Sequence, residues 1–459
     1  VSGLSEPLLA MLLLGSFLCY LKYRDGEADS WRWLAGSILL FTLGAFAKET
    51  AIVFPVIVLA CEWPGASQAK AEHDSAATES RSSFKTLKTG FLRALPFGMV
   101  ALVYLAVRYA VLKGFGHTTT PLSFATIVYT WPSVLWAYIK ALIWPFGLSP
   151  FYDTPYVSQP TFVNFFLPLA GLLIVIAGLV WVARRSAAAR VAALWLVLPI
   201  LPLCNLAVFP EGEIVHDRYL YLPSVGFAIL AALALTRIRL GGPSFLRQPS
   251  GVVAASAGVA LILGAATLVQ QSHWKSNFSL FSFSALVAPN NSIVANNLGN
   301  EFVARGEFDR AIEIYQRVLE NKPTFWLANY NLGYSYYKLD RLDEAERYLT
   351  RATEIKRSDP DQYVYLGLTQ MKAGRLSEAA TNIRRAIERK PDAFGYHFAL
   401  GSVLKKSGDL EGALEQFKAE LVNNPRQTAA VQQIADIEAR LNNGGNEQVK
   451  NLAPASPSR

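Results

Sequence analysis

Four glycines in the C-terminal part of the chain, Gly299, Gly333, Gly367 and Gly401, follow one another at steps of 34 residues. Four alanines, Ala311, Ala345, Ala379 and Ala413, keep the same step. A fixed period of this length indicates one small structural unit that is repeated along the chain. Such a unit cannot bury its apolar face alone, so each copy must pack on its neighbours. We therefore expect a stack of similar units.

A period of 34 residues, with glycine in a first helix and alanine in a second, is typical of the tetratricopeptide repeat (TPR). Phased on the glycines, the repeats run 292–325, 326–359, 360–393 and 394–427. Each glycine lets the backbones of the two helices approach closely. A last amphipathic stretch, 428–441, is expected to cap the exposed apolar end. We predict a TPR α-solenoid over 292–441, which would offer a concave surface to a peptide or protein.

The rest of the chain is unusually apolar. The 459 residues are 52% hydrophobic, and the long apolar runs lie within residues 1–272. A helix needs about 17 to 25 mostly apolar residues to cross a bilayer. The candidate spanning segments are 4–21, 33–47, 50–62, 94–112, 163–183, 191–209, 219–236 and 251–271. A further stretch, 133–148, is short and contains Lys140 and Pro145, so we expect it to be re-entrant or interfacial.

These patterns predict an all-α chain, a polytopic membrane helix bundle followed by a TPR α-solenoid. We expect about eight spanning helices over 1–272, a linker over 273–291, and a disordered tail over 442–459 that has little apolar surface to bury. Basic clusters lie around 22–32, 70–93, 184–190 and 237–247, in alternate loops. Since basic loops stay cytoplasmic, the repeats are predicted to be extracytoplasmic, in the periplasm or the ER lumen.

Composition argues against several other classes of protein. The net charge of +8 is explained by the short basic loops, so we expect no nucleic-acid partner. The three cysteines, Cys19, Cys61 and Cys204, and the five scattered histidines show no metal-ligand spacing, so we predict no metal site. The chain has no glycine-rich phosphate loop with lysine, no zinc-protease motif and no nucleophile elbow.

Charged residues at the outer ends of the apolar segments are the best candidates for chemistry, because charge beside a bilayer is costly and often functional. Lys48-Glu49 separates two short apolar segments. One interpretation is a mutual ion pair that stabilises a tight helical hairpin. The other is that Lys48 binds a lipid-linked phosphate, with Glu49 as an acidic neighbour.

A second charged cluster runs from Glu211 to Arg218, just before an apolar segment. Arg218 can pair with phosphate oxygens, and His216 is a second candidate for donor binding. Glu213 and Asp217 are candidate acidic residues of the same site. The alternative is an interfacial anchor, because arginine and tyrosine belong at a headgroup boundary.

In the repeats, Asn297, Asn331, Tyr330 and Tyr334 are the candidates for a groove that holds a peptide backbone. The alternative is that the tyrosines pack within the solenoid.

The motifs resemble those of the transmembrane and TPR O-mannosyltransferase-like proteins, in the order of that family. His216-Asp217-Arg218-Tyr219-Leu220-Tyr221-Leu222-Pro223-Ser224-Val225-Gly226-Phe227 is similar to its ERYLYLPS-GF segment. Trp144-Pro145-Phe146-Gly147-Leu148-Ser149, Lys48-Glu49 and Val1-Ser2-Gly3 are similar to its WP-x-x-LS, KE and SGR segments. The sequence departs from the family at Leu4, where the family has arginine, and at Asp217, where it has glutamate. Glu6 corresponds to the acidic residue that follows.

The resemblance implies a membrane glycosyltransferase of the C-type multi-helix fold. Such an enzyme transfers a sugar, here mannose or another hexose, from a polyprenyl-phosphate donor to an extracytoplasmic protein acceptor that the repeats hold. Its catalytic acidic residues lie in a first outer loop. Because the chain opens on Val1 without a methionine, we expect that loop in an N-terminal part that is missing here. No cofactor is predicted with certainty, and a divalent metal stays open. The alternative function is a non-catalytic, membrane-anchored TPR scaffold for envelope or secretory protein assembly.

Overall fold

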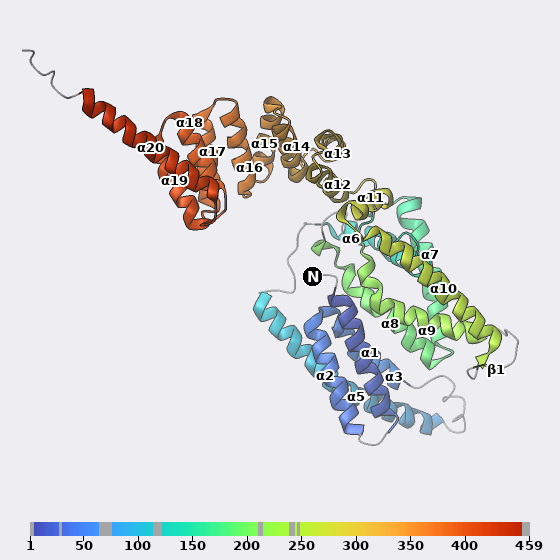
Figure 1. Cartoon of the computed structure of the whole chain (residues 1–459). Coiled ribbons are helices and arrows are strands. Elements are labelled where there is room, and N and C mark those ends of the chain that lie inside the picture. Colours follow the sequence, from blue (N-terminus) through green and yellow to red (C-terminus); the bar gives the residue numbers. More distant parts are fainter. Residues whose placement is uncertain are drawn as a thin grey trace, which may run out of the picture. The chain divides into compact units, whose positions relative to one another are not determined.

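The computed structural model describes residues 4–26, 30–63, 76–112, 122–209, 214–237, 244–245 and 248–451 (Figure 1). The chain divides into two compact units, Val1–Asn291 and Ser292–Arg459. The described residues are helical apart from short connections, the non-helical segment 144–161 and one antiparallel pairing of β1, Ser244–Phe245, with β2, Gln248–Pro249. The prediction of an all-α membrane bundle followed by a TPR solenoid is confirmed.

The first unit contains long helices with short helical turns between them. Its elements are α1 Ser5–Arg24, α2 Ser30–Ala47, η1 Glu49–Val53, α3 Phe54–Glu62, α5 Ala76–Leu112, α6 Phe124–Ile143, η2 Phe162–Phe166, α7 Leu167–Ala183, α8 Ala187–Val197, η3 Leu198–Cys204, η4 Leu206–Val208, η5 Asp217–Leu220, α9 Tyr221–Arg237, α10 Ser250–His273 and α11 Asn277–Val287.

Six helices of the described residues are long and apolar enough to cross a membrane. They are Ser5–Arg24, Lys88–Leu112, Phe162–Ala183, Ala187–Cys204, Asp217–Arg237 and Ser250–His273. The two other predicted spans are α2 and the pair η1–α3, which fall outside this set. The stretch 133–148 is split, because α6 ends at Ile143 and a non-helical segment begins at Trp144.

Aromatic side chains form the core of the first unit between α1, α2, α3, α5 and α8. Phe54 stacks on Phe41 with ring centres 5.4 Å apart, and Phe97 lies edge-on to both rings. Trp195 of α8 is fully buried against Phe54. The helices α1 and α2 are also joined by Ser16 and Ser37, because each hydroxyl donates to the carbonyl of the other serine, at 2.8 and 2.7 Å.

The second unit is a series of paired helices. They are α12 Ser292–Ala304, α13 Phe308–Asn321, α14 Trp326–Lys338, α15 Leu342–Ile355, α16 Pro360–Lys372, α17 Leu376–Arg389, α18 Tyr396–Ser407, α19 Leu410–Asn423 and the final α20 Thr428–Asn451. Each 34-residue unit of the sequence holds one pair, shown side by side in Figure 1.

The recurring glycines lie where two helices touch. A Cβ on Gly299 would stand 2.4 Å from the ring of Tyr315, and one on Gly333 would stand 2.7 Å from Leu349. The four periodic alanines are fully buried on the facing helices. The close approach that the glycine period predicts is therefore present. Ile437 of α20 is buried in the last core cluster, so α20 covers the end of the stack.

Candidate functional site

Polar side chains gather at two opposite ends of the helices of the first unit. At one end, Glu62 accepts hydrogen bonds from the Tyr20 hydroxyl at 2.6 Å and from Arg93 at 2.8 Å. Arg190 donates to the carbonyl oxygen of Trp63 at 2.7 Å beside them. Arg93 and Arg190 come from loops that the charge pattern predicts to be cytoplasmic, and the structure brings these helix ends together.

Lys48 lies at the other end, between α2 and η1. Its ammonium forms an ion pair with Glu6 of α1. Both side chains are largely buried, with 16% of Lys48 and 4% of Glu6 exposed. The Lys48 Nζ also lies 4.6 Å from the ring centre of Tyr219. The start of α1, the end of α2 and the turn η5, which precedes α9, therefore meet at this ammonium group.

Glu49 has a different partner. It pairs with Arg108, near the C-terminal end of α5, at 3.5 Å. The interpretation of Lys48-Glu49 as a mutual ion pair is therefore wrong. The reason is the extended backbone of Lys48, φ −163° and ψ 144°, because neighbouring side chains of extended chain point to opposite sides. Sequence reasoning also missed Arg108, although an arginine inside a predicted span is itself a signal of a functional site.

Arg218 lies in η5, directly before Tyr219 in the sequence. Its guanidinium carbon is 5.2 Å from the ring centre of Tyr219, and Nη2 is 3.5 Å from the Tyr219 hydroxyl. Within the part of the chain that the structure describes, no carboxylate lies within ion-pair distance of Arg218. The acidic candidate Glu213 falls outside the described residues.

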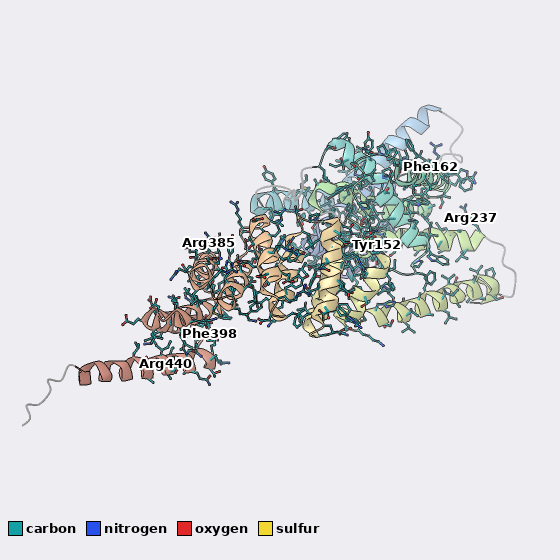
Figure 2. All side chains as sticks on the ribbon, turned by 90° about the horizontal axis from the view of Figure 1, so that it is seen from above. Tyr152, Phe162, Arg237, Arg385, Phe398 and Arg440 are labelled. Carbon is teal, nitrogen blue, oxygen red and sulfur yellow. The ribbon has the colours of Figure 1, made fainter. Side chains whose placement is uncertain are left out.

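His216 and Asp217 are held by the loop that follows α6. The His216 Nδ1 is 2.9 Å from the carbonyl oxygen of Pro150, and it carries a proton because a carbonyl only accepts. Asp217 accepts a hydrogen bond from the Tyr152 hydroxyl. Burial first, and then the Asp217 carboxylate, raise the pKa of Tyr152 above its ordinary value, so the phenol stays a donor. Tyr152 is labelled in Figure 2.

The structure thus brings Lys48, Tyr219 and Arg218 into one neighbourhood and places His216 beside it, its ring 5.7 Å from that of Tyr219. Asp217 is turned towards Tyr152 instead. In the described ranges, no group of three or more His, Cys, Asp or Glu side chains is placed to hold a metal ion. Glu6, Glu49 and Asp217, three described carboxylates of this end, are paired with Lys48, Arg108 and Tyr152, respectively.

The first helices of three repeats line a cavity of about 260 Å³. Its walls are Asn300, Val303 and Ala304 of α12, Tyr330, Asn331 and Tyr334 of α14, and Tyr365 of α16. Three of the four predicted groove residues lie here together. The fourth, Asn297, is not among the lining residues, and Asn300, one helical turn further, takes that place.

The tyrosines of this cavity pack on one another as well as lining it. Tyr330 and Tyr334 contact the ring of Tyr365, with ring centres 6.0 and 4.9 Å apart. Burial raises the pKa of Tyr365 to about 12 and that of Tyr330 further, so these phenols are neutral donors. Packing within the solenoid and lining a groove are therefore both true of these side chains.

Two amide groups of the cavity are oriented by their neighbours. The Asn300 Oδ1 accepts a hydrogen bond from the Tyr315 hydroxyl at 2.6 Å. The Asn331 Nδ2 donates to the Asn296 Oδ1 at 2.9 Å. The Asn300 Nδ2 and the Asn331 Oδ1 have no hydrogen-bond partner among the described residues. The cavity offers one donor and one acceptor beside neutral aromatic rings.

Comparison with known proteins agrees with this arrangement. Residues 296–361 and 366–428 match the family model described as "Tetratricopeptide repeat". The chain is 26% identical over 380 residues to Protein O-mannosyl-transferase TMTC3 of Mus musculus, covering 75% of this chain and 39% of that protein. It is 32% identical over 161 residues to Protein O-mannosyl-transferase Tmtc3 of Drosophila melanogaster, covering 34% of this chain and 17% of that protein.

Among solved structures, YrrB, titled a TPR protein with an unusual peptide-binding site, is 24% identical. It covers 36% of this chain and 84% of its own, at a TM-score of 0.32, too low a likeness to bear on function. The chain spans well under half the length of the two curated relatives. With six apolar helices among the residues that the structure describes, it is an integral membrane protein. The resemblance that the motifs indicate is confirmed, and the TPR-bearing protein O-mannosyl-transferases are homologues of this chain.

Proposed function

We propose that this chain is part of a membrane glycosyltransferase that transfers a hexose such as mannose from a polyprenyl-phosphate donor to a protein acceptor. The named activity of its homologues supports the reaction class. The observation that carries the proposal is the position of Arg218, beside Lys48 and Tyr219 and without a carboxylate partner among the described residues.

Charge balance selects Arg218 as the main donor-binding cation. The charge of Lys48 is offset by Glu6, and that of Arg108 by Glu49. Arg218 keeps its charge for an anion, and a guanidinium can bind two phosphate oxygens at once. Lys48 adds a second positive group at the same end of the bundle, and His216 lies next to Tyr219.

The proposed chemistry follows from this set of groups. Negative charge grows on the polyprenyl phosphate as the bond to the sugar breaks, and Arg218 with Lys48 stabilises it electrostatically. A carboxylate deprotonates the acceptor hydroxyl. We do not assign that step to Glu6, Glu49 or Asp217, because each of them is held by a partner in the structure.

The repeats serve the acceptor. An extended peptide needs a donor for its C=O and an acceptor for its N–H. The Asn300 Nδ2 and the Asn331 Oδ1 supply both. Tyr330 and Tyr334 then accommodate an uncharged side chain. The repeats are extracytoplasmic in this proposal, because Arg93 and Arg190, which belong to two of the basic clusters, lie at the opposite end of the bundle from Arg218.

The test is transfer of labelled hexose from polyprenyl-phosphate hexose to an acceptor protein, with the complete protein in membranes. We expect Arg218→Ala to lower the rate by about 100-fold, as loss of a group that stabilises the transition state does. Arg218→Lys should retain part of the activity, because a lysine keeps the charge without the bidentate geometry. Arg237→Ala, at the other end of α9 (Figure 2), is the matched control and should leave the rate unchanged.

The alternative, a non-catalytic scaffold, uses the same repeat groove but needs no donor. It predicts no transfer by the complete wild-type protein. It also predicts that partner binding depends on Asn331 and Tyr334 and is unaffected by Arg218→Ala. Unchanged transfer in Arg218→Ala would reject the donor assignment.

A further inference from the structure

Six consecutive residues, Leu148–Asp153, contact two separate parts of the first unit, and we call them the coupling loop. The loop follows Gly147, whose φ of +70° turns the chain back after α6. It contains the end of the motif at Trp144–Ser149, for which the proposed function has no use so far.

One side of the coupling loop holds the segment that carries Arg218. The Ser149 N–H donates to the Tyr152 hydroxyl oxygen at 3.1 Å, and the Tyr152 hydroxyl donates in turn to Asp217. The Pro150 carbonyl accepts from His216, which is 9% exposed. Both residues immediately before Arg218 are therefore fastened to this loop.

The other side holds the segment formed by α10, α11 and the residues up to Asn290. Gln270 of α10 donates to the Leu148 carbonyl. The Ser149 and Ser284 hydroxyls are 3.2 Å apart, and both serines are buried. The ring centre of Phe151 lies 6.2 Å from the ring centre of Phe281 in α11. These contacts connect the loop to both helices.

Asp153 extends these contacts to the end of the unit. Its carboxylate accepts from the backbone and the side-chain nitrogen of Asn290, at 3.0 and 3.2 Å. Asn290 precedes Ser292, the first residue of the first repeat helix, by two positions. Asp153, four residues after Ser149, therefore joins the coupling loop to a residue two positions before the first repeat helix.

We propose that the coupling loop is a positioning element that holds Arg218 in its place for the donor phosphate and makes that place depend on α11. The inference rests on the proposed function, because that function gives Arg218 its role. Tyr152 is a positioning residue, since it acts on the phosphate only through Asp217 and the adjoining Arg218. Buried hydrogen-bonded networks suit this task, because a partly broken network is costly. Engagement of the repeats by an acceptor would then alter donor affinity, and the reverse must hold by linkage.

The test is a double-mutant cycle on the binding of polyprenyl monophosphate to the complete protein in nanodiscs. We expect Tyr152→Phe to weaken binding by about 5- to 10-fold, in the lower range of coupling between sites. Arg218→Ala should weaken it further, and the double variant should bind no worse than Arg218→Ala alone, because Tyr152 acts through Arg218. Ser284→Ala, which acts from α11, should weaken binding two- to five-fold and also lose its effect in the Arg218→Ala background.

Tyr156→Phe is the matched control, because its hydroxyl donates to the Phe209 carbonyl at 2.5 Å and not to Asp217. It should leave phosphate binding within about two-fold. Thermal unfolding of each variant distinguishes a loss of phosphate affinity from a loss of the folded state. If Tyr152→Phe does not fold, Ser284→Ala still tests the coupling loop.

Additive losses of Tyr152→Phe and Arg218→Ala would overturn the positioning role, since they would mean that Tyr152 acts independently of Arg218. Weaker binding in Arg218→Ala with unchanged binding in Tyr152→Phe and Ser284→Ala would reject the coupling loop while the donor site stands. Unchanged binding in Arg218→Ala itself would reject the donor site, and the coupling loop with it.

Discussion

At the scale of single residues, the ion pair of Lys48 and Glu6 shows how a charge is kept beside the membrane. A buried charge is tolerated when a partner and further polar or aromatic contacts replace water. Glu6 has the ammonium of Lys48, and Lys48 has in addition the face of Tyr219. The pair joins α1 to α2 and keeps the Lys48 ammonium beside Tyr219, the residue that follows Arg218.

Removal of one partner should therefore be worse than removal of both. We expect Lys48→Ala to destabilise the protein by about 3 kcal/mol, because it leaves Glu6 buried and uncompensated. The double variant Lys48→Met/Glu6→Leu should recover much of that loss. Thermal unfolding in detergent measures both effects, with Lys22→Ala, a surface lysine over the Trp33 ring, as the control. Equal losses in the single and double variants would contradict this description of the pair.

The tyrosines of the repeat groove predict a loss of stability at high pH. Burial raises the folded-state pKa of Tyr365 to about 12, whereas an unfolded tyrosine has a pKa of about 10. A raised folded pKa means that this contribution is complete below pH 10 and is lost as the pH rises towards 12. We expect the unfolding temperature of the repeats, followed by circular dichroism, to fall over that window.

Tyr365→Phe removes one of these titrating groups. Its unfolding temperature should decline less between the two pKa values than that of the unaltered protein, even if it starts lower. Tyr348→Phe, on a second helix and outside the cavity, is the comparison variant. A decline that is the same in all three proteins would show that the groove tyrosines do not cause it.

At the scale of elements, close helix contacts decide where a side chain fits. A Cβ on Gly226 of α9 would lie 2.3 Å from the carbonyl oxygen of Ala192 and 2.4 Å from the nitrogen of Leu196, both backbone atoms of α8. Neither atom belongs to a flexible side chain that could move away. The contact between α8 and α9 therefore depends on this glycine, and α9 begins just after Arg218.

We expect Gly226→Ala to destabilise the protein by about 1 to 3 kcal/mol, the usual cost of overpacking, and to lower donor binding because α9 shifts. Gly178→Ala in α7 is the matched control, since a Cβ there meets nothing within 4 Å. Thermal unfolding and phosphate binding of the two variants should differ clearly. A Gly226→Ala protein as stable as the control would show that α8 and α9 are not packed this closely.

The local sequence pattern was enough to predict the helices. It did not predict which side chains distant in the sequence contact one another. The 34-residue period of glycine and alanine specifies paired helices, because the same contact recurs in each unit. Length and apolar content likewise identify the six apolar helices. The pairing of Lys48 with Glu6 and of Tyr152 with Asp217 joins residues 42 and 65 positions apart, and no local rule relates such positions.

The interpretation of Lys48-Glu49 as a mutual ion pair, one of the two alternatives for these residues, is wrong for the same reason. Adjacent residues of opposite charge suggest an ion pair only if the backbone lets them face each other, and the extended Lys48 does not. Asn297 was predicted to line the groove, whereas Asn300 lines it in the structure. Which of the two asparagines faces the groove depends on where the neighbouring helix lies. Motifs select candidate residues for the site, whereas the geometry that relates these residues depends on the fold.

At the scale of the whole molecule, the chain combines a membrane unit, in which we propose a site for a lipid phosphate, with a repeat unit, in which we propose a groove for a peptide. The connection between the two functions runs through covalent sequence, from α11 through Asn290 into the first repeat. A transferase needs both substrates near one reactive bond, so linking their binding has an obvious use. In our proposal, the coupling loop is the element of the first unit that links the binding of the two substrates.

The most direct test is photo-crosslinking of a polyprenyl monophosphate with a photoactivatable group beside its phosphate to the complete protein in membranes. Mass spectrometry of the crosslinked peptides locates the headgroup. We predict crosslinks on peptides that contain Lys48 or Arg218–Tyr219, and their loss when excess unlabelled lipid phosphate competes. Specific crosslinks confined to the opposite end of the bundle, around Glu62 and Arg93, would contradict the assignment of the donor site.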